Sequence, residues 1–186
     1  MGLPPDLQSA LLGRRVVFLR GRLDEANANS VIAQLLLVGQ TAAGRPIELY
    51  VDSPGGSAQA ALSVYDVLRT SPSPISTTCV GTAGGASVLV LAAGASGSRF
   101  ALPHARVHLM DEPVTVQVGP AQQIGGQADE VARLQTRWQA ALVRHVTHSG
   151  AQLARDLAEG RWLSAAEARD YGLVDDIIPG APPATV

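Results

Sequence analysis

The sequence predicts an α/β fold built on a largely parallel sheet, and three observations support this prediction. Apolar strand-like runs alternate with helical patterns along the first half of the chain. Ala, Val, Leu and Gly dominate, while charged residues are 16% and aromatic residues 4%, which suits close packing of helices on a sheet. At 186 residues the chain is long enough for one domain with a substantial core.

Three strands are expected in the first half, each followed by a helix. The β-branched and apolar runs at 16–19, 47–51 and 75–80 predict the strands. Asp24 precedes apolar residues at helical spacing, and Ser57 is placed to cap a helix that continues to Leu68. The third strand leads into a glycine-rich helix from about Gly84 to Ala93. Strands that alternate with helices imply parallel pairing through crossover connections.

Short strands, a long helix and a closing strand are expected in the second half. The strand-like segments lie at 99–102, 106–109 and 114–118, and 174–178 predicts the last strand. A helix is expected from 119–120 to about His148, and Ser164 with Glu167 fits a capping box for a later helix. Apolar residues on the long helix form a stripe that faces either the chain's own core or a partner. The stripe comprises Ile124, Ala128, Val131, Trp138 and Leu142.

Charge and composition argue against several classes of protein. The net charge is −2 and no Lys/Arg cluster occurs, so neither nucleic acid nor an anionic membrane is an expected partner. Cys79 is the only cysteine, which excludes an intrachain disulfide. The first residues lack the pattern of a signal peptide, and no apolar run approaches the roughly 20 residues that span a bilayer. We therefore expect a cytoplasmic protein, and no cofactor or metal site is predicted.

Two motifs carry the chemistry that the sequence suggests. Residues 51–56 (VDSPGG) close an apolar strand, and residues 79–87 (CVGTAGGAS) open an apolar helix. Adjacent glycines let backbone N–H groups face a ligand, as in the oxyanion hole of a serine peptidase. An ordinary tight turn would require the same glycines, so the first motif alone does not decide between the two interpretations.

Together with their spacing and flanking residues, these motifs resemble the proteolytic subunit family of the ATP-dependent Clp protease. That family carries SPGG followed by C-x-G-x-A-x-S-M-G, and the resemblance covers nearly the whole chain, from Leu11 to Asp175. It implies the Clp protease/crotonase-like fold of repeated β-β-α units with a protruding strand-helix handle. The single domain 1–186 would have its core at 11–112 and 150–178, its handle at about 113–149 and a loose tail at 179–186.

The register of the resemblance also implies that the catalytic triad is degenerate. The position of the nucleophilic serine falls on Gly85, and that of the aspartate falls on Gly160. The position of the histidine falls on Met110 when counted from the preceding arginine, or on Asp111 when counted back from the following proline. None of these residues supplies the group that the family uses there. The oxyanion-hole positions implied by the family are Gly55, Gly56 and Ala86.

Two neighbouring side chains are weak substitutes for the missing groups. Ser87 lies two residues beyond Gly85, and two helical residues rotate a side chain by about 200°, away from the glycine turn. A serine that bonds back to a nearby carbonyl is the favoured interpretation. His108 lies two strand residues before Met110, a displacement of about 6.5 Å from the expected base.

The leading interpretation is a catalytically inactive homologue that acts as a structural or regulatory subunit of a ring-shaped Clp peptidase assembly. The family builds heptameric rings, often stacked in pairs as a tetradecamer, so the predicted partners are copies of this chain or paralogous subunits. Docking of a Clp ATPase is expected to be weakened, because Tyr50 matches one aromatic of the family's docking pocket while Glu48 replaces another.

Two alternatives remain open at the level of sequence. One is an active ATP-dependent serine endopeptidase with a site rearranged around Ser87, His108 and Asp111. The other is a crotonase-like acyl-CoA-binding enzyme, since that superfamily shares the fold and also stabilises an oxyanion with glycine amides.

Overall fold

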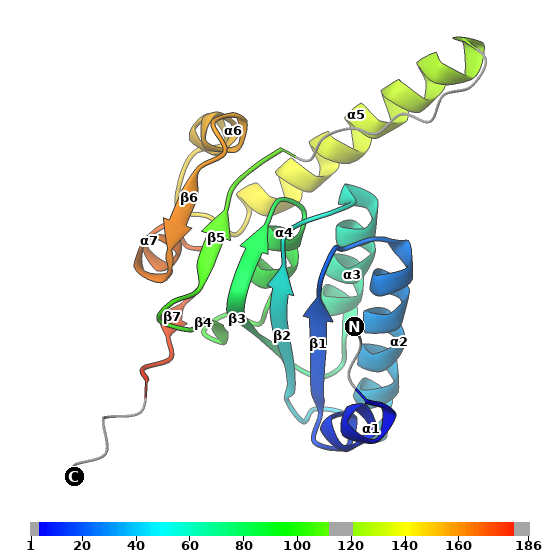
Figure 1. The fold of residues 1–186 in the computed structure, drawn as a ribbon, viewed down its shortest axis with the longest axis vertical. Helices are drawn as coiled ribbons and strands as arrows, with labels where there is room; N and C mark the ends of the chain where they lie inside the picture. Colours follow the sequence, from blue (N-terminus) through cyan, green and yellow to red (C-terminus); the bar gives the residue numbers. More distant parts are fainter. Residues whose placement is uncertain (1–3, 112–120, 181–186) are drawn as a thin grey trace.

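A computed structural model describes residues 4–111 and 121–180, which fold around one seven-stranded sheet (Figure 1). The strands follow the order β1-β2-β3-β4-β7, and β5 pairs with β3 and with β6. The strands are β1 (Val16–Arg20), β2 (Ile47–Ser53), β3 (Ile75–Gly84), β4 (Arg99–Ala101), β5 (Arg106–His108), β6 (Trp162–Ser164) and β7 (Asp176–Ile177). The helices are α1 (Pro5–Gly13), α2 (Glu25–Thr41), α3 (Ala58–Thr70), α4 (Ser87–Ala92), α5 (Ala121–Val143), α6 (Gly150–Ala158) and α7 (Ala165–Asp170).

The long strand β3 organises the sheet, because it pairs with two different strands on the same side. Residues 77–79 pair with β4, and residues 82–84 pair with β5. All pairings of the sheet are parallel except that between β5 and β6. This arrangement confirms the predicted α/β class with a largely parallel sheet.

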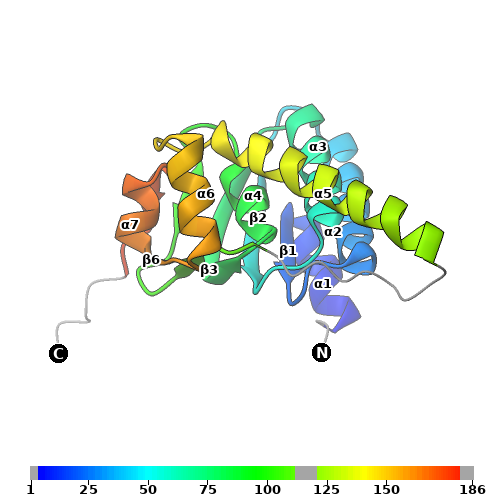
Figure 2. The same cartoon turned by 90° about the horizontal axis from the view of Figure 1, so that it is seen from above.

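Alternation along the strands separates a buried face of the sheet from an open one. Leu19 of β1 and Val51 of β2 are fully buried under the helices. Phe18 and Tyr50, on the opposite face, stack on each other with ring centroids 5.3 Å apart and remain partly exposed. Helix α5 crosses over α3 and α4, and its first turns extend beyond the body of the molecule (Figure 2). The core therefore lies between the sheet and these helices.

Hydrogen bonds at the helix starts confirm the caps predicted at Ser57 and Ser164 and show further caps at Asp24 and Ser149. The Asn27 N–H donates to Asp24 Oδ1 at 2.8 Å, at the start of α2. Ser57 accepts from the backbone N–H at the third residue of α3, and Ser149 caps α6 in the same way. Ser164 and Glu167 form the complete capping box of α7. Each cap satisfies backbone donors that would otherwise have no intrahelical partner.

Several predicted boundaries were wrong. Strand β3 continues past Val80 to Gly84, because its last residues pair with β5, and α4 begins only at Ser87. The long helix ends at Val143 instead of continuing to His148, and a separate helix, α6, follows at residues 150–158. The predicted strand at 114–118 lies outside the described residues, and so do parts of the predicted handle and tail. The division into core, handle and tail stays a prediction.

Arg15 is a buried charge held by backbone carbonyl groups. It is 7% exposed, and its guanidinium donates to the carbonyl oxygens of Val38 (2.7 Å), Arg45 (2.8 Å) and Pro46 (2.9 Å). A fourth hydrogen bond reaches Ser73 Oγ at 3.2 Å. Val38 lies near the end of α2, where unpaired carbonyl groups favour a positive charge. Arg15 thus joins the end of α2 to the loop that leads into β2.

Replacing Arg15 should destabilise the fold. For Arg15→Ala we expect a loss of about 3 kcal/mol in the free energy of unfolding, because several carbonyl groups lose their donor. Urea denaturation followed by circular dichroism measures the change. Arg14→Ala, at the exposed neighbouring position, is the matched control and should leave the midpoint almost unchanged. Equal effects of the two substitutions would contradict this role of Arg15.

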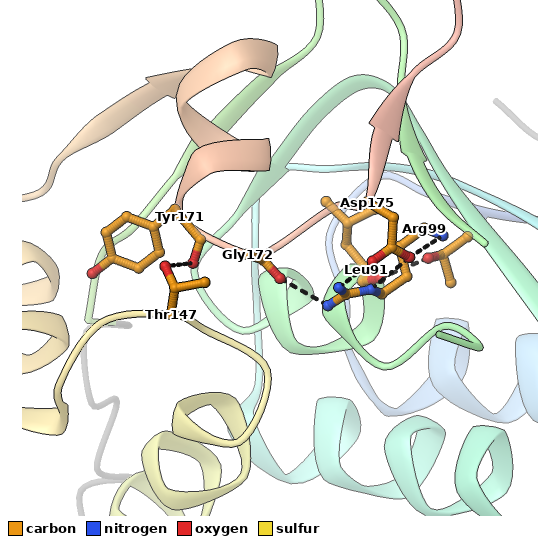
Figure 3. Close-up of polar contacts among 7 residues, drawn as sticks. Leu91, Arg99, Thr147, Tyr171, Gly172 and Asp175 are labelled. Atoms are coloured by element: carbon orange, nitrogen blue, oxygen red, sulfur yellow. Dashed lines mark hydrogen bonds and ion pairs between the residues drawn. The ribbon is translucent and has the colours of Figure 1, made fainter. Parts of the chain in front are cut away.

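Arg99 ties the last strands of the sheet together. Figure 3 shows its side chain reaching Asp175 and the carbonyl of Gly172, to which Nη1 donates at 2.8 Å. The Asp175 carboxylate accepts from Nε at 3.0 Å, from Nη2 and from the Arg99 backbone N–H. Burial alone would raise the pKa of Asp175, but these hydrogen bonds and the guanidinium charge outweigh it and lower the pKa.

The lowered pKa of Asp175 makes part of the stability depend on pH. The ionised Asp175 carboxylate stabilises the fold fully above its unfolded-state pKa. This stabilisation is lost as the pH falls through the lower folded-state pKa. We expect Asp175→Asn to be less stable than the unmodified chain at pH 7, with a difference that shrinks toward acid pH. Chemical denaturation between pH 7 and the acid limit of folding measures it. A difference independent of pH would contradict the role assigned to the carboxylate.

Candidate functional site

The turn after β2 is built on backbone contacts too close for side chains. A Cβ on Gly56 would overlap the carbonyl oxygen of Leu23, and the two residues form an isolated parallel bridge. A Cβ on Gly84 would lie 2.5 Å from the carbonyl oxygen of Pro54. Gly55 has φ +122°, and its N–H donates to Ser53 Oγ at 3.3 Å. Packing therefore requires glycine at positions 56 and 84, and the positive φ favours glycine at position 55, whatever chemistry the turn performs.

Asp52 connects this turn to β3. Its Oδ1 accepts from the Thr82 N–H at 3.1 Å, and a Cβ on Gly81 would overlap the same oxygen. The register of β2 against β3 shifts between Val51 and Ser53, at the point where this carboxylate intervenes. The two sequence motifs are thus joined directly, by the side chain of one and the backbone of the other.

Gly85 lies where β3 turns into α4. It has φ +45°, is buried, and donates its N–H to the His108 carbonyl oxygen at 3.0 Å. The next residue, Ala86, accepts from the indole Nε1 of Trp138 at 3.2 Å, and Trp138 is only 1% exposed. Helix α5 therefore holds the turn in place through the hydrogen bond from Trp138 to Ala86. Gly85 therefore presents no side chain at the position that the family resemblance implies for the nucleophile.

The Ser87 hydroxyl is committed to the backbone. It is fully buried and donates to the carbonyl oxygen of Gly84 (2.7 Å) or of Ser53 (3.1 Å). Its oxygen also accepts from the Gly84 N–H at 3.1 Å. With one hydrogen to donate, the hydroxyl joins the end of β2 to the end of β3. These contacts support a structural role for Ser87.

His108 contacts the predicted position of the acid. Its Nε2 lies 3.2 Å from the carbonyl oxygen of Gly160, and its ring stacks on Trp162 with centroids 4.0 Å apart. Gly160 has φ +67° and offers only this backbone oxygen. Val107 and Leu109 on either side are fully buried, so the alternation of the strand directs the His108 side chain to the opposite face. The structure brings His108 and Gly160 together, but Gly160 has no carboxylate to orient the ring.

The two candidate positions for the base have different surroundings. Asp111 Oδ1 accepts from Gln135 Nε2 at 2.8 Å and from Gln139 Nε2 at 3.1 Å, so its carboxylate is held by α5. Met110 is half-buried and carries no titratable group. Ser87, His108 and Asp111 consequently make three separate sets of contacts, and the hydrogen bonds do not link them into a proton relay of the kind that a serine peptidase needs.

The cysteine of the second motif does not offer a replacement nucleophile. Cys79 is completely buried in β3, and burial is the main cause that raises its pKa to about 12. The nearby charge of Asp52 raises it further. Because the thiolate is the reactive form, a thiol with this pKa is inert near neutral pH.

Three residues of α5 that hold this region were not predicted as site residues from the sequence. Gln135 and Gln139 contact Asp111, and Trp138 contacts Ala86. Their spacing places these residues on adjoining parts of one helical face, and Trp138 already belonged to the predicted apolar stripe. The contacts themselves link residues more than twenty positions apart, which the pattern of a single helix does not reveal.

Comparison with known proteins gives consistent results. The model of the family described as Clp protease matches residues 4–181. A Clp protease proteolytic subunit-like protein of Streptomyces coelicolor is 45% identical over 183 residues, covering 97% of this chain and 87% of the relative. The ATP-dependent Clp protease proteolytic subunit 2 of Corynebacterium glutamicum is 37% identical over 177 residues, covering 95% of this chain and 88% of the relative. That of Corynebacterium diphtheriae is 36% identical, with coverages of 97% and 90%.

Among the described helices, none has both the length and the apolar character needed to cross a membrane.

Removing the Ser87 hydroxyl should weaken the fold. In Ser87→Ala the buried Gly84 N–H loses its acceptor, and we expect a loss of about 1–3 kcal/mol in the free energy of unfolding. Urea denaturation measures it. Ser63→Ala is the matched control, since its hydroxyl is exposed and bonds back to Gln59 within α3, and it should change the stability much less. A Ser87→Ala protein as stable as the control would contradict the structural role.

Proposed function

Because the chain belongs to the Clp protease family, we propose that it is a non-catalytic proteolytic-subunit homologue that serves as a structural or regulatory member of a ring-shaped Clp peptidase assembly. The proposed partners are further copies of this chain or paralogous subunits with an intact triad, arranged in heptameric rings.

One observation carries the proposal. The family's turn is built with its close glycine contacts, but Gly85 stands at the position implied for the nucleophile and offers no hydroxyl. The nearest hydroxyl, on Ser87, is fully buried and bonded to Gly84 and Ser53. A serine becomes nucleophilic only when a base removes its proton, and neither bond of Ser87 leads to a base. The scaffold contacts thus persist while the groups for proton transfer are missing.

The surface of α5 supports association with other subunits. Trp138 and Leu142 of the predicted stripe are buried in the chain's own core. Val131 and Leu134, nearer the start of the helix, stay half-exposed. The first turns of α5 extend from the body of the molecule (Figure 1). A projecting helix with half-exposed apolar residues is a natural contact for a second subunit.

Weakened ATPase docking is part of the proposal. Tyr50 lies on the open face of the sheet beside Phe18, and its hydroxyl donates to Glu48 Oε2 at 3.1 Å. An apolar side chain that docks on these rings would have to remove the Glu48 carboxylate from water, which costs free energy. We propose that ATPases engage a mixed assembly mainly through its other subunits.

Restoring the missing hydroxyl alone should not restore proteolysis. We expect both the unmodified chain and Gly85→Ser to leave a fluorogenic peptide uncleaved, because the His108 ring is held at Gly160 and Trp162 and Gly160 supplies no carboxylate. A triad-intact Clp subunit assayed alongside is the positive control. Hydrolysis by the isolated unmodified chain that Ser87→Ala abolishes would instead support the rearranged-site alternative and contradict the proposal.

The oligomeric part of the proposal is tested by native mass spectrometry of the purified chain, alone and mixed with a paralogous subunit. We expect rings of seven subunits, homomeric or mixed. Val131→Glu combined with Leu134→Glu should weaken stacking between rings, since it places charges on half-exposed apolar positions of α5. Ala132→Glu combined with Thr136→Glu, at exposed positions of the same helix, is the matched control and should leave stacking unchanged. A chain that stays monomeric under both conditions would rule out the ring role.

A further inference from the structure

A positively charged pocket lies at the corner of the molecule where three helices end. Helices α3, α4 and α5 finish there, at Thr70, Ala92 and Val143. The pocket has a volume of about 310 Å³, which reaches the range of small-molecule sites. It is lined by Arg69, Gly94, Ser96, Arg99, Arg144 and His145.

Two of the three arginines that line this pocket lack a carboxylate partner within the described part of the chain. Arg99 is neutralised by Asp175, as Figure 3 shows, and its remaining fork donates to Gly172. Arg69 and Arg144 are exposed, and in the described part of the chain neither forms an ion pair with a carboxylate. No acidic residue is among those that line the pocket. Two uncompensated guanidinium groups therefore face one small volume.

The negative partial charges at the helix C-termini balance part of the positive charge of the arginines, but not all of it. The C-terminus of a helix carries about half a negative charge, which attracts arginines to this corner. Partial charges of this kind are screened by water and fall off within one turn, so they leave much of two full positive charges uncompensated. The guanidinium donors of Arg69 and Arg144 also remain without hydrogen bonds to the rest of the described chain, and an anion would supply them.

We propose that this pocket binds the phosphate group of a small phosphorylated molecule. Each guanidinium is a planar fork that matches a pair of oxygens. A carboxylate has two oxygens and satisfies one fork, whereas a phosphate has enough oxygens for both arginines and for the Ser96 hydroxyl. The volume left beyond the phosphate would hold the organic group that carries it. This site is separate from the degenerate triad and does not depend on the function proposed above.

His145 provides a reporter inside the pocket. Burial, then the charges of Arg99, Arg69 and Arg144, lower its pKa to about 4, and its Nε2 lies 3.3 Å from the Tyr65 hydroxyl. Asp175, which is paired with Arg99, also lies near this pocket. A bound phosphate would offset the positive field and raise the pKa of His145, because binding and protonation are reciprocally linked.

Titration of the purified full-length chain with inorganic phosphate at constant ionic strength tests the proposal. Calorimetry should show saturable binding with one phosphate per chain, and histidine NMR signals should show a higher pKa for His145. Arg69→Gln and Arg144→Gln should each weaken the affinity about tenfold or more, because each removes a charge-assisted pair of hydrogen bonds. Arg133→Gln, which removes an exposed charge elsewhere on the chain, is the matched control and should leave the affinity unchanged.

Three results would overturn the proposal. They are the absence of saturable binding, a loss of affinity in Arg133→Gln equal to that in the pocket variants, and binding of acetate as tightly as phosphate at the same ionic strength. The second would indicate a general effect of net charge, and the third would assign the pocket to carboxylates.

Discussion

The close approach of two strand ends is the constraint on which the rest of this structure depends. The backbone of the turn after β2 passes so near Leu23 and Gly84 that no side chain fits at Gly56 or Gly84. The Ser87 hydroxyl completes the junction by bonding to both strand ends. Because the junction fixes where β3 ends and α4 begins, it also fixes Gly85, the contact of Ala86 with Trp138 and the pairing of β3 with β5.

Because of this constraint, the fold of a Clp protease subunit and its catalytic chemistry depend on different residues. The glycines of the turn are needed for packing in any case, so they can persist when catalysis is absent. Positions that matter only for proton transfer would be free to change, and under the proposal these are Gly85, Gly160 and either Met110 or Asp111. The contacts of Asp111 with two glutamines of α5 suit a residue that holds the fold together. The proposed role as a structural subunit of a ring rests on this division.

Local sequence signals predicted much of the fold. Strands β1 and β2 followed from apolar runs, and the caps at Ser57 and Ser164 followed from residue type and spacing. The end of β3 was wrong because pairing with β5, a tertiary contact, extends the strand beyond its apolar run. Helix α6 was not predicted, although Ser149 caps it, and the long helix expected before it was placed as ending at about His148.

The candidate site was less accessible to sequence reasoning than the fold. The family resemblance predicts triad positions at Gly85 and Gly160, but the stacking of His108 on Trp162 and the burial of Ser87 depend on distant contacts. The most direct test of the central claim is the intact mass of the purified chain after exposure to a fluorophosphonate, which reacts only with an activated serine. Our account predicts no added mass on the folded chain, alongside full labelling of a triad-intact Clp subunit. Stoichiometric labelling of Ser87 would contradict it.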